Sequence, residues 1–180
     1  MGKGLYALIA GLIGIGIVHI ATLLLIPAVS DIDTWTRVAA LGDLNEFHRI
    51  ERQDAAAASI RALDPTFEVT ACRFDLSEGA VAVQSIGTAP FWSLSIYNRR
   101  GENIFSINDR TANQDDLDVI IATPAQVVDL KKQLDPALSD SIITENDIDE
   151  GFVVLRAFAE DESMKPAILE FLDNASCDLY

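Results

Sequence analysis

The first thirty residues constrain this chain most, because they carry almost no charge. Residues 4–30 contain no Asp, Glu, Lys or Arg, and the apolar run over residues 5–26 is broken only by His19 and Thr22. Roughly 22 residues at about 1.5 Å per residue give about 33 Å, which is enough to cross the hydrocarbon core of a bilayer. The sequence therefore predicts an N-terminal transmembrane anchor over residues 1–30.

The charges on either side of this run predict its orientation. Lys3 lies on the short N-terminal side, whereas Asp31 and Asp33 begin the other flank. The positive-inside bias then keeps the N-terminus in the cytoplasm of a Gram-negative cell and places the rest of the chain in the periplasm. A cleaved signal peptide is the alternative, since residues 28–30 are small-x-small. The apolar run is, however, longer than the roughly 7 to 15 residues of a signal sequence.

Small residues gather on one face of the predicted helix at about 100° per residue. Such residues let a second helix approach closely, which predicts a helix–helix contact. The predicted contact residues are Ala7, Ala10, Gly11, Gly14 and Ala21. Gly and Ala are common in membrane helices, so a helix that pairs with nothing is the alternative. His19 lies off this face; an ionisable residue in a span is a functional candidate by default, and the alternative is a tolerated neutral His without a specific role.

The rest of the chain is acidic. Lys3 is the only charged residue before Asp31, so the net charge of -15 corresponds to -15 minus 1, or -16, for the part that follows. Such a domain repels nucleic acid and anionic lipid headgroups, so no nucleic-acid partner is expected. At 180 residues, the chain has room for one anchor and one domain of ordinary size.

Hydrophobic periodicity predicts a helix followed by strands. Apolar residues recur at every third position from Trp35 to Ile50, so we expect a helical stalk over residues 31–64, ended by Pro65. After Pro65 the pattern changes to an alternation of apolar and polar residues, which is typical of strands. Strands are predicted over residues 67–74, 80–86, 91–97, 104–107, 117–122, 141–144 and 152–158.

Turn residues predict how these strands connect. Hairpins are expected across residues 77–79, 98–101 and 146–151. Thr123 and Pro124 predict the start of a helix that ends near residue 134, and Ser163 begins a last helix that ends near residue 174. The fold class is therefore α+β: a transmembrane helix and helical stalk, then a periplasmic domain over residues 65–180 with a mainly antiparallel sheet and two further helices.

Cys72 and Cys177 are the only cysteines. In an oxidising periplasm they could form a disulfide that ties the C-terminal end to the sheet. Two buried thiols are the alternative. A redox pair is not indicated, because the sequence has no Cys-x-x-Cys motif.

Three arginines and a tryptophan are candidate contacts for a ligand or partner. Arg99 and Arg100 lie at a predicted hairpin tip, and Arg110 follows the next strand. The planar guanidinium group suits recognition of a carboxylate or phosphate. The alternative is a solvated turn with local ion pairs. Trp92 can serve as a ligand platform or as part of the sheet core.

No residue pattern predicts a catalytic, cofactor-binding or metal-binding site. The carboxylates over residues 115–118 and 145–150 lack the spacing of a calcium loop, so solvated turns are expected. His19 and His48 are the only histidines and form no metalloprotease motif. A nucleophile elbow and a glycine-rich phosphate loop are also absent. No cofactor is therefore expected.

Two stretches resemble a known family. The run PFWSLSIYN at residues 90–98, with Gly101 and the NDR run at residues 108–110, resembles the domain-of-unknown-function twelve-fifty-four family. Residues 122–124 and the run DEGFVVLRA at residues 149–157 look like its short, membrane-anchored alphaproteobacterial branch. The resemblance covers about residues 70–175. It implies placement and architecture but no chemistry, and it implies that the companion domain of larger relatives would come from a partner protein.

These features predict a single-pass inner-membrane protein with a periplasmic interaction domain. We expect a non-enzymatic accessory subunit of an envelope or membrane-protein complex, whose partner is an integral membrane protein or a companion envelope protein. Homo-oligomerisation is a further option. The alternative is a periplasmic enzyme or a small-ligand or lipid-binding domain of unknown substrate, which would be favoured by a pocket where Trp92 and Arg110 converge.

Overall fold

The computed structural model describes residues 2–29, 34–50, 64, 66–87, 89–112, 116–133 and 141–180, with side chains only up to residue 25 in the first range. The chain divides into two compact units, Met1–Asp33 and Thr34–Tyr180. The described helices are α1 (Gly2–Val29), α2 (Thr34–Ala39), α3 (Pro124–Gln133) and α4 (Lys165–Asp173). The described strands are β1 (Phe47–Arg49), β2 (Phe67–Asp75), β3 (Val81–Ser85), β4 (Trp92–Asn98), β5 (Asn103–Asn108), β6 (Leu117–Ala122), β7 (Ile142–Glu145), β8 (Glu150–Phe158) and β9 (Ser176–Leu179).

The first unit contains α1, a helix made almost entirely of apolar residues. Its segment Gly2–Leu25 has a mean hydropathy of 2.5, and all of its described side chains are exposed. By length and composition the segment can cross a membrane. Thr22 donates its hydroxyl to the carbonyl of Val18 at 2.8 Å, so this polar group is satisfied within the helix. The structure confirms the predicted long apolar helix.

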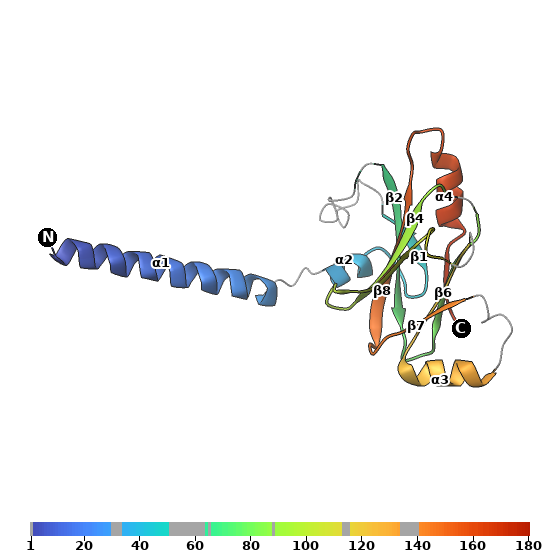
Figure 1. Ribbon diagram of the computed structural model, residues 1–180, viewed down its shortest axis with the longest axis horizontal. Coiled ribbons are helices and arrows are strands. Elements are labelled where there is room, and N and C mark those ends of the chain that lie inside the picture. The colour runs from blue at the N-terminus through green and yellow to red at the C-terminus, as the bar shows by residue number, and fades with distance from the viewer. Residues whose placement is uncertain are drawn as a thin grey trace. The chain divides into compact units, whose positions relative to one another are not determined.

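The second unit, Thr34–Tyr180, is built on two β-sheets and is called the sheet unit below (Figure 1). Sheet A has the strand order β1-β2-β8-β4-β5, and all of its pairs are antiparallel. Sheet B has the order β7-β6-β3-β9, in which the β6–β7 pair is parallel and the other two pairs are antiparallel. The predicted α+β class with mainly antiparallel strands is therefore confirmed.

Alternate side chains of both sheets meet in one core. Leu94 and Ile96 of β4 enter it from sheet A, and Val81 and Val83 of β3 enter it from sheet B. Successive side chains of a strand point to opposite faces, so the period-two pattern of the sequence directs every second residue into this core. Helix α4 adds three buried side chains, those of Ile168, Phe171 and Leu172.

Each sheet also has apolar residues on its outer face, where a helix covers them. Val38 of α2 is buried together with Val69 of β2 on sheet A. Val127 and Leu130 of α3 are buried against Ile120 of β6 on sheet B. Figure 1 shows α3 and α4 at opposite ends of the sheet unit.

Side-chain capping fixes the start of α3. The backbone N–H of Gln126 donates to Thr123 Oγ1 at 3.3 Å, and the backbone N–H of Thr123 donates to Gln126 Oε1 at 2.8 Å. This reciprocal pair is a capping box, and Pro124 occupies the first helical position, where no N–H is needed. Gln126 also donates through Nε2 to the carbonyl of Leu76 at 2.6 Å, which ties the helix to the end of β2.

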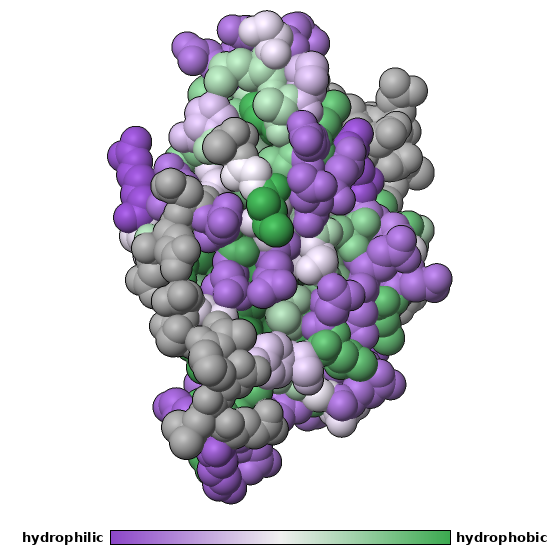
Figure 2. Space-filling model, turned by 90° about the vertical axis from the view of Figure 1, so that its right-hand side faces the viewer, coloured by the Kyte–Doolittle hydropathy of each residue, from purple (hydrophilic) through white to green (hydrophobic). Residues whose placement is uncertain are grey.

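The face of the sheet unit drawn in Figure 2 is mostly polar. Figure 2 shows a face on which hydrophilic residues predominate and apolar residues are scattered. Among the described residues of this unit, the exposed large hydrophobic side chains are Leu44, Ile86, Val128, Leu179 and Tyr180. Scattered apolar residues are ordinary on folded proteins, so the face in Figure 2 is not a broad apolar docking surface.

The helix predicted over residues 31–64 is wrong after its first turns. Helix α2 ends at Ala39, and β1 pairs with β2 with Phe47 opposite Cys72. Asn45 has a φ of 58°, a left-handed conformation from which a helix cannot continue and which Asn adopts more readily than most residues. The three-residue spacing thus came from a short helix, a turn and an edge strand. Residues 51–63 of the predicted stalk lie outside the described residues.

Two of the three predicted hairpins are also wrong. Strands β2 and β3 follow one another in sequence but lie in different sheets, and β7 pairs with β6 rather than with β8. Strand β8 is buried along most of its length, so it occupies a central position between β2 and β4. The hairpin of β4 and β5 is confirmed. Strand β9, which the sequence pattern did not predict, pairs with β3.

Candidate functional site

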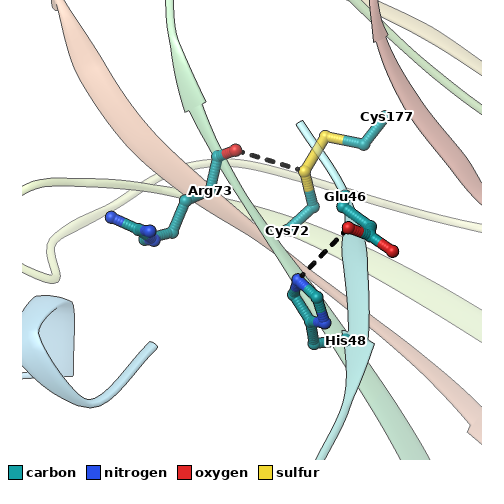
Figure 3. Close-up of a disulfide and its surroundings, with 5 residues drawn as sticks. All are labelled: Glu46, His48, Cys72, Arg73 and Cys177. Atoms are coloured by element: carbon teal, nitrogen blue, oxygen red, sulfur yellow. Dashed lines mark hydrogen bonds and ion pairs between the residues drawn. A yellow bond between two sulfur atoms is a disulfide. The ribbon is translucent and has the colours of Figure 1, made fainter. Parts of the chain in front are cut away.

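The two cysteines form the predicted disulfide. Cys72 lies in β2 of sheet A and Cys177 in β9 of sheet B; both are buried, and their Cα atoms are 6.6 Å apart. Figure 3 shows the bond next to Arg73, whose carbonyl oxygen is 3.3 Å from Cys72 Sγ, and the nearby pair of Glu46 and His48. A disulfide sulfur has no proton to donate, so the Arg73 contact is a packing contact. The bond joins the two sheets covalently.

Arg99, at the tip of the β4–β5 hairpin, belongs to a cluster that includes α2. Its Nη1 donates to Glu150 Oε2 at 2.6 Å, and its guanidinium carbon lies 5.5 Å from the centre of the Trp35 ring. The guanidinium carbon of Arg73 lies 5.6 Å from the same ring, and Arg73 Nη2 donates to the carbonyl of Gly42 at 2.8 Å. Two cation–π contacts thus hold α2 to sheet A. Arg99 is engaged within the protein.

The other two predicted arginines lie at opposite ends of β5. Arg100 pairs with Glu102 at 3.0 Å before the strand begins. Arg110 follows the strand in an exposed turn, where its backbone N–H donates to Asn108 Oδ1 at 3.1 Å. Six strand residues extend about 20 Å. The structure therefore does not gather the three arginines into one site.

Trp92 lines a cavity whose walls come from both sheets. Its side chain is 1% exposed, and its ring stacks on Phe171 with the ring centres 6.4 Å apart. The cavity volume is about 380 Å³. The apolar lining residues are Ile86, Trp92, Ile107, Ala112, Leu117, Val119 and Ile142. The polar lining residues are Gln84, Ser85, Asp116, Asp118, Asn174 and Ser176.

Hydrogen bonds organise the polar wall of this cavity. Asp118 accepts one from Gln84 Nε2 at 3.1 Å and another from Ser141 Oγ at 2.6 Å, on different carboxylate oxygens. Ser85 is buried and donates its hydroxyl to the carbonyl of Phe171 at 2.6 Å. The hydroxyl of Ser85 is thus committed to a structural bond and is not paired with a base.

The charge of the cavity lining is negative. Asp116 and Asp118 supply two carboxylates, and none of the described lining residues is Lys, Arg or His. None of the three predicted arginines lines it. Asp118 lies in β6 rather than in the solvated turn expected over residues 115–118, and the sequence pattern does not mark Gln84 or Asn174 as candidates. No local motif connects these residues, because they come from β3, β6 and the segments next to β6 and α4.

A second, more open depression of about 570 Å³ lies at the hairpin tip. It is lined by Asp75, Ser77, Asn98, Arg99, Arg100, Ile148, Asp149 and Glu150. The hydroxyl and amide of Ser77 hold the pKa of Asp75 below its ordinary value. Asn98 and then Arg100 lower the pKa of Glu102. These carboxylates offset the guanidinium charges, so the depression is not a positive site for an anion.

Metal binding has no support among the residues that the structure describes. Within them, no group of three or more His, Cys, Asp or Glu side chains is placed to hold a metal ion. The acidic run over residues 145–150 spans the end of β7, a connecting segment and the start of β8.

The small-residue face of α1 contains an open groove. It is lined by Gly11, Gly14, Ile15, Val18, His19 and Thr22. A Cβ added at Gly11 or Gly14 would meet nothing within 4 Å, as at Gly16 on another face, so no other described part of the chain packs against these glycines. The groove includes two residues of the predicted contact face and also His19, whereas Ala7, Ala10 and Ala21 do not line it.

No known family model and no curated protein sequence matches this chain. Its fold is similar to that of the VPA0106 protein from Vibrio parahaemolyticus, with a TM-score of 0.59 and 12% identity over 82% of this chain and 35% of that one. It is also similar to an uncharacterized protein from Burkholderia cenocepacia, with a TM-score of 0.55 and 14% identity over 82% of this chain and 38% of the other. The chain spans about a third of the length of these solved proteins, and the likeness shows the fold alone.

Proposed function

We propose that this protein is a membrane-tethered interaction domain that serves as a non-enzymatic accessory subunit of an envelope complex. The observation that carries the proposal is an exposed apolar helix, α1, followed after four residues by the start of a compact unit with a buried disulfide. Such a helix restricts the sheet unit to a membrane surface, where a partner in the same membrane meets it at high effective concentration.

The disulfide and the flanking charges support a periplasmic location for the sheet unit. Disulfides persist in oxidising compartments, and the bacterial periplasm is one of these. Lys3 precedes the apolar helix, whereas Asp31 and Asp33 follow it, which favours a cytoplasmic N-terminus. We therefore propose a single-pass inner-membrane protein whose C-terminal unit faces the periplasm.

The groove around Gly11 and Gly14 is the contact that we propose for a partner helix. Without a hydrophobic driving force inside the bilayer, helices associate where small residues allow their backbones to pack closely. The groove at Gly11 and Gly14 supplies such a site, and the polar residues Thr22 and His19 also line it. The partner is an integral membrane protein or a companion envelope protein, and a second copy of this chain is the other option.

Affinity purification tests this proposal. Tagged full-length protein is extracted from its native host in a mild detergent, and the proteins that accompany it are quantified. We expect a stoichiometric membrane partner that Gly11→Ile and Gly14→Ile variants lose. Gly16→Ile is the matched control, because it adds the same side chain about 140° or more away around the helix.

One outcome would count against the accessory role, and two others would count against the glycine face as the contact. A protein that purifies alone, under conditions that keep known complexes intact, would argue against any stable partner. A partner lost equally in the Gly16→Ile control would show that the glycine face is not the contact. A partner retained after replacement of α1 by an unrelated helix would instead move the contact to the sheet unit.

Small-ligand binding is a second candidate function, and the cavity beside Trp92 favours it. Pockets of about 300 to 1,000 Å³ accommodate small molecules, and this cavity falls within that range. Its lining combines an apolar wall with a few polar groups, as ligand sites commonly do. Membership of the domain-of-unknown-function twelve-fifty-four family stays a prediction that would itself assign no ligand.

A further inference from the structure

The cavity beside Trp92 has two chemically different walls. In the apolar part of the lining, Trp92 and Ile107 are buried at 1% and 8% exposed, whereas Ile86 is 72% exposed. The polar part of the lining includes Asp116, which is exposed, and Asp118, whose carboxylate accepts two hydrogen bonds. A molecule that fills this space therefore needs both an apolar body and a polar group.

The charges of the cavity lining determine which charge the polar group of a ligand should carry. A carboxylate oxygen has more than one acceptor position, so Asp118 can accept further hydrogen bonds beyond those from Gln84 and Ser141. Among the lining residues that the structure describes, no basic side chain compensates for Asp116 and Asp118. The net charge of -15 adds a negative field over the whole chain, which attracts cations and repels anions. The cavity thus disfavours a carboxylate or phosphate ligand.

The apolar lining that a ligand can reach is mainly aliphatic. Cations are attracted to the faces of aromatic rings, but the ring of Trp92 is 1% exposed and stacks on Phe171, so it offers no open face. Ile86 and Ile142 lie in the same lining as Asp116 and Asp118, so one ligand can contact an aliphatic side chain and a carboxylate together. This arrangement selects a compact amine that carries an apolar group.

We propose that the cavity between the sheets binds a small organic cation, a primary amine attached to an aromatic or branched apolar body. The ammonium group is held by Asp116 and Asp118, and the apolar body lies against Ile86, Ile107 and Ile142. The proposal rests on the second candidate function, ligand binding, and is independent of the partner proposed for α1.

Three probes of similar size and different charge test this proposal. They are 2-phenylethylamine, the neutral 2-phenylethanol and the anion phenylacetate, each titrated into the full-length protein in a non-ionic detergent. Trp35 and Trp92 are the only tryptophans, so a Trp35→Phe variant makes Trp92 the reporter. We expect saturable fluorescence changes with the amine at concentrations where the alcohol and the acid give none. The thermal unfolding shift of the unsubstituted protein provides a second readout that does not depend on the variant.

Isosteric substitutions then locate the charge. Asp116→Asn and Asp118→Asn should each weaken amine binding by about threefold, the usual size of a partly screened ion pair. Asp129→Asn is the matched control, because Asp129 lies on α3 outside the cavity lining and its loss should leave binding unchanged. If all three variants weakened amine binding equally, the preference for the amine would come from the overall charge of the protein. This result would overturn the assignment of the site to the cavity.

The outcomes distinguish the recognition of a cation from ligand binding in general. Alcohol binding as tight as amine binding would refute recognition of a cation and leave ligand binding standing. No binding of any probe, by fluorescence or by thermal shift, would refute ligand binding as well. Neither result would alter the partner found by affinity purification.

Discussion

Loss of the disulfide should remove a large part of the stability of the sheet unit. Cys72 and Cys177 are 105 residues apart, and the chain-entropy model then gives about 16 cal/mol/K, or about 4.7 kcal/mol at 25 °C. Folded domains are typically stable by only about 5 to 15 kcal/mol. We therefore expect a Cys72→Ala, Cys177→Ala double variant to lose about 4 to 5 kcal/mol in the free energy of unfolding, with a small addition from the two buried voids.

Urea denaturation of the full-length protein in non-ionic detergent measures this loss. Tryptophan fluorescence follows unfolding of the sheet unit, because Trp35 and Trp92 both lie there. The reduced unsubstituted protein is the matched control, since it keeps both sulfur atoms and lacks only the bond. It should lose nearly as much free energy of unfolding as the double variant. A loss below about 1 kcal/mol in both proteins would refute the entropic reasoning.

Two further predictions concern packing and pH. Gly151→Ala should cost about 1 to 3 kcal/mol, because a Cβ there would lie 2.5 Å from both the ring of Phe74 and a backbone carbonyl of β4. Gly79→Ala, where the nearest atom would be 3.7 Å away, should change the free energy of unfolding by less than about 0.5 kcal/mol; equal losses in urea would contradict the steric argument. The hydroxyl of Ser163, followed by its amide, lowers the pKa of Asp161. The contribution of Asp161 to stability is therefore fully present above the unfolded-state pKa and is lost as pH falls through the lower folded-state pKa. A carboxyl NMR titration should give Asp161 a midpoint below that of an unstructured Asp, and an ordinary midpoint would remove this interpretation.

Local patterns were sufficient to predict most strands but not their partners. The bounds of β6 match the predicted strand, because its mostly apolar residues indicate a buried strand whichever strands lie beside it. The turn after β2 shows what a local pattern does not predict. A few residues such as 77–79 can return a chain to the same sheet or pass it to the facing one, and only packing decides. Phe74 and Val81 lie in the same core although their strands belong to different sheets.

The disulfide and the cavity also differ in how far the sequence could predict them. The disulfide could be predicted from the number of cysteines and an oxidising compartment, without knowledge of their distance. The cavity could not be predicted, because Gln84, Asp118 and Asn174 meet only through the order of strands in sheet B and the position of α4. Trp92 was a candidate contact together with arginines. Its actual neighbours in the cavity lining include carboxylates, which reverses the charge expected of a ligand.

The Cys72–Cys177 bond also determines how the protein would transmit a mechanical load. A pull between α1 and Tyr180 follows the backbone to Cys72, crosses the sulfur–sulfur bond and leaves through the few residues after Cys177. The chain between the two cysteines, which contains β3 to β8, carries no backbone tension on this path. A partner that pulls on the C-terminal end would therefore load the backbones of β1, β2 and β9, and the strands around Trp92 would receive this load only through their contacts with β2 and β9.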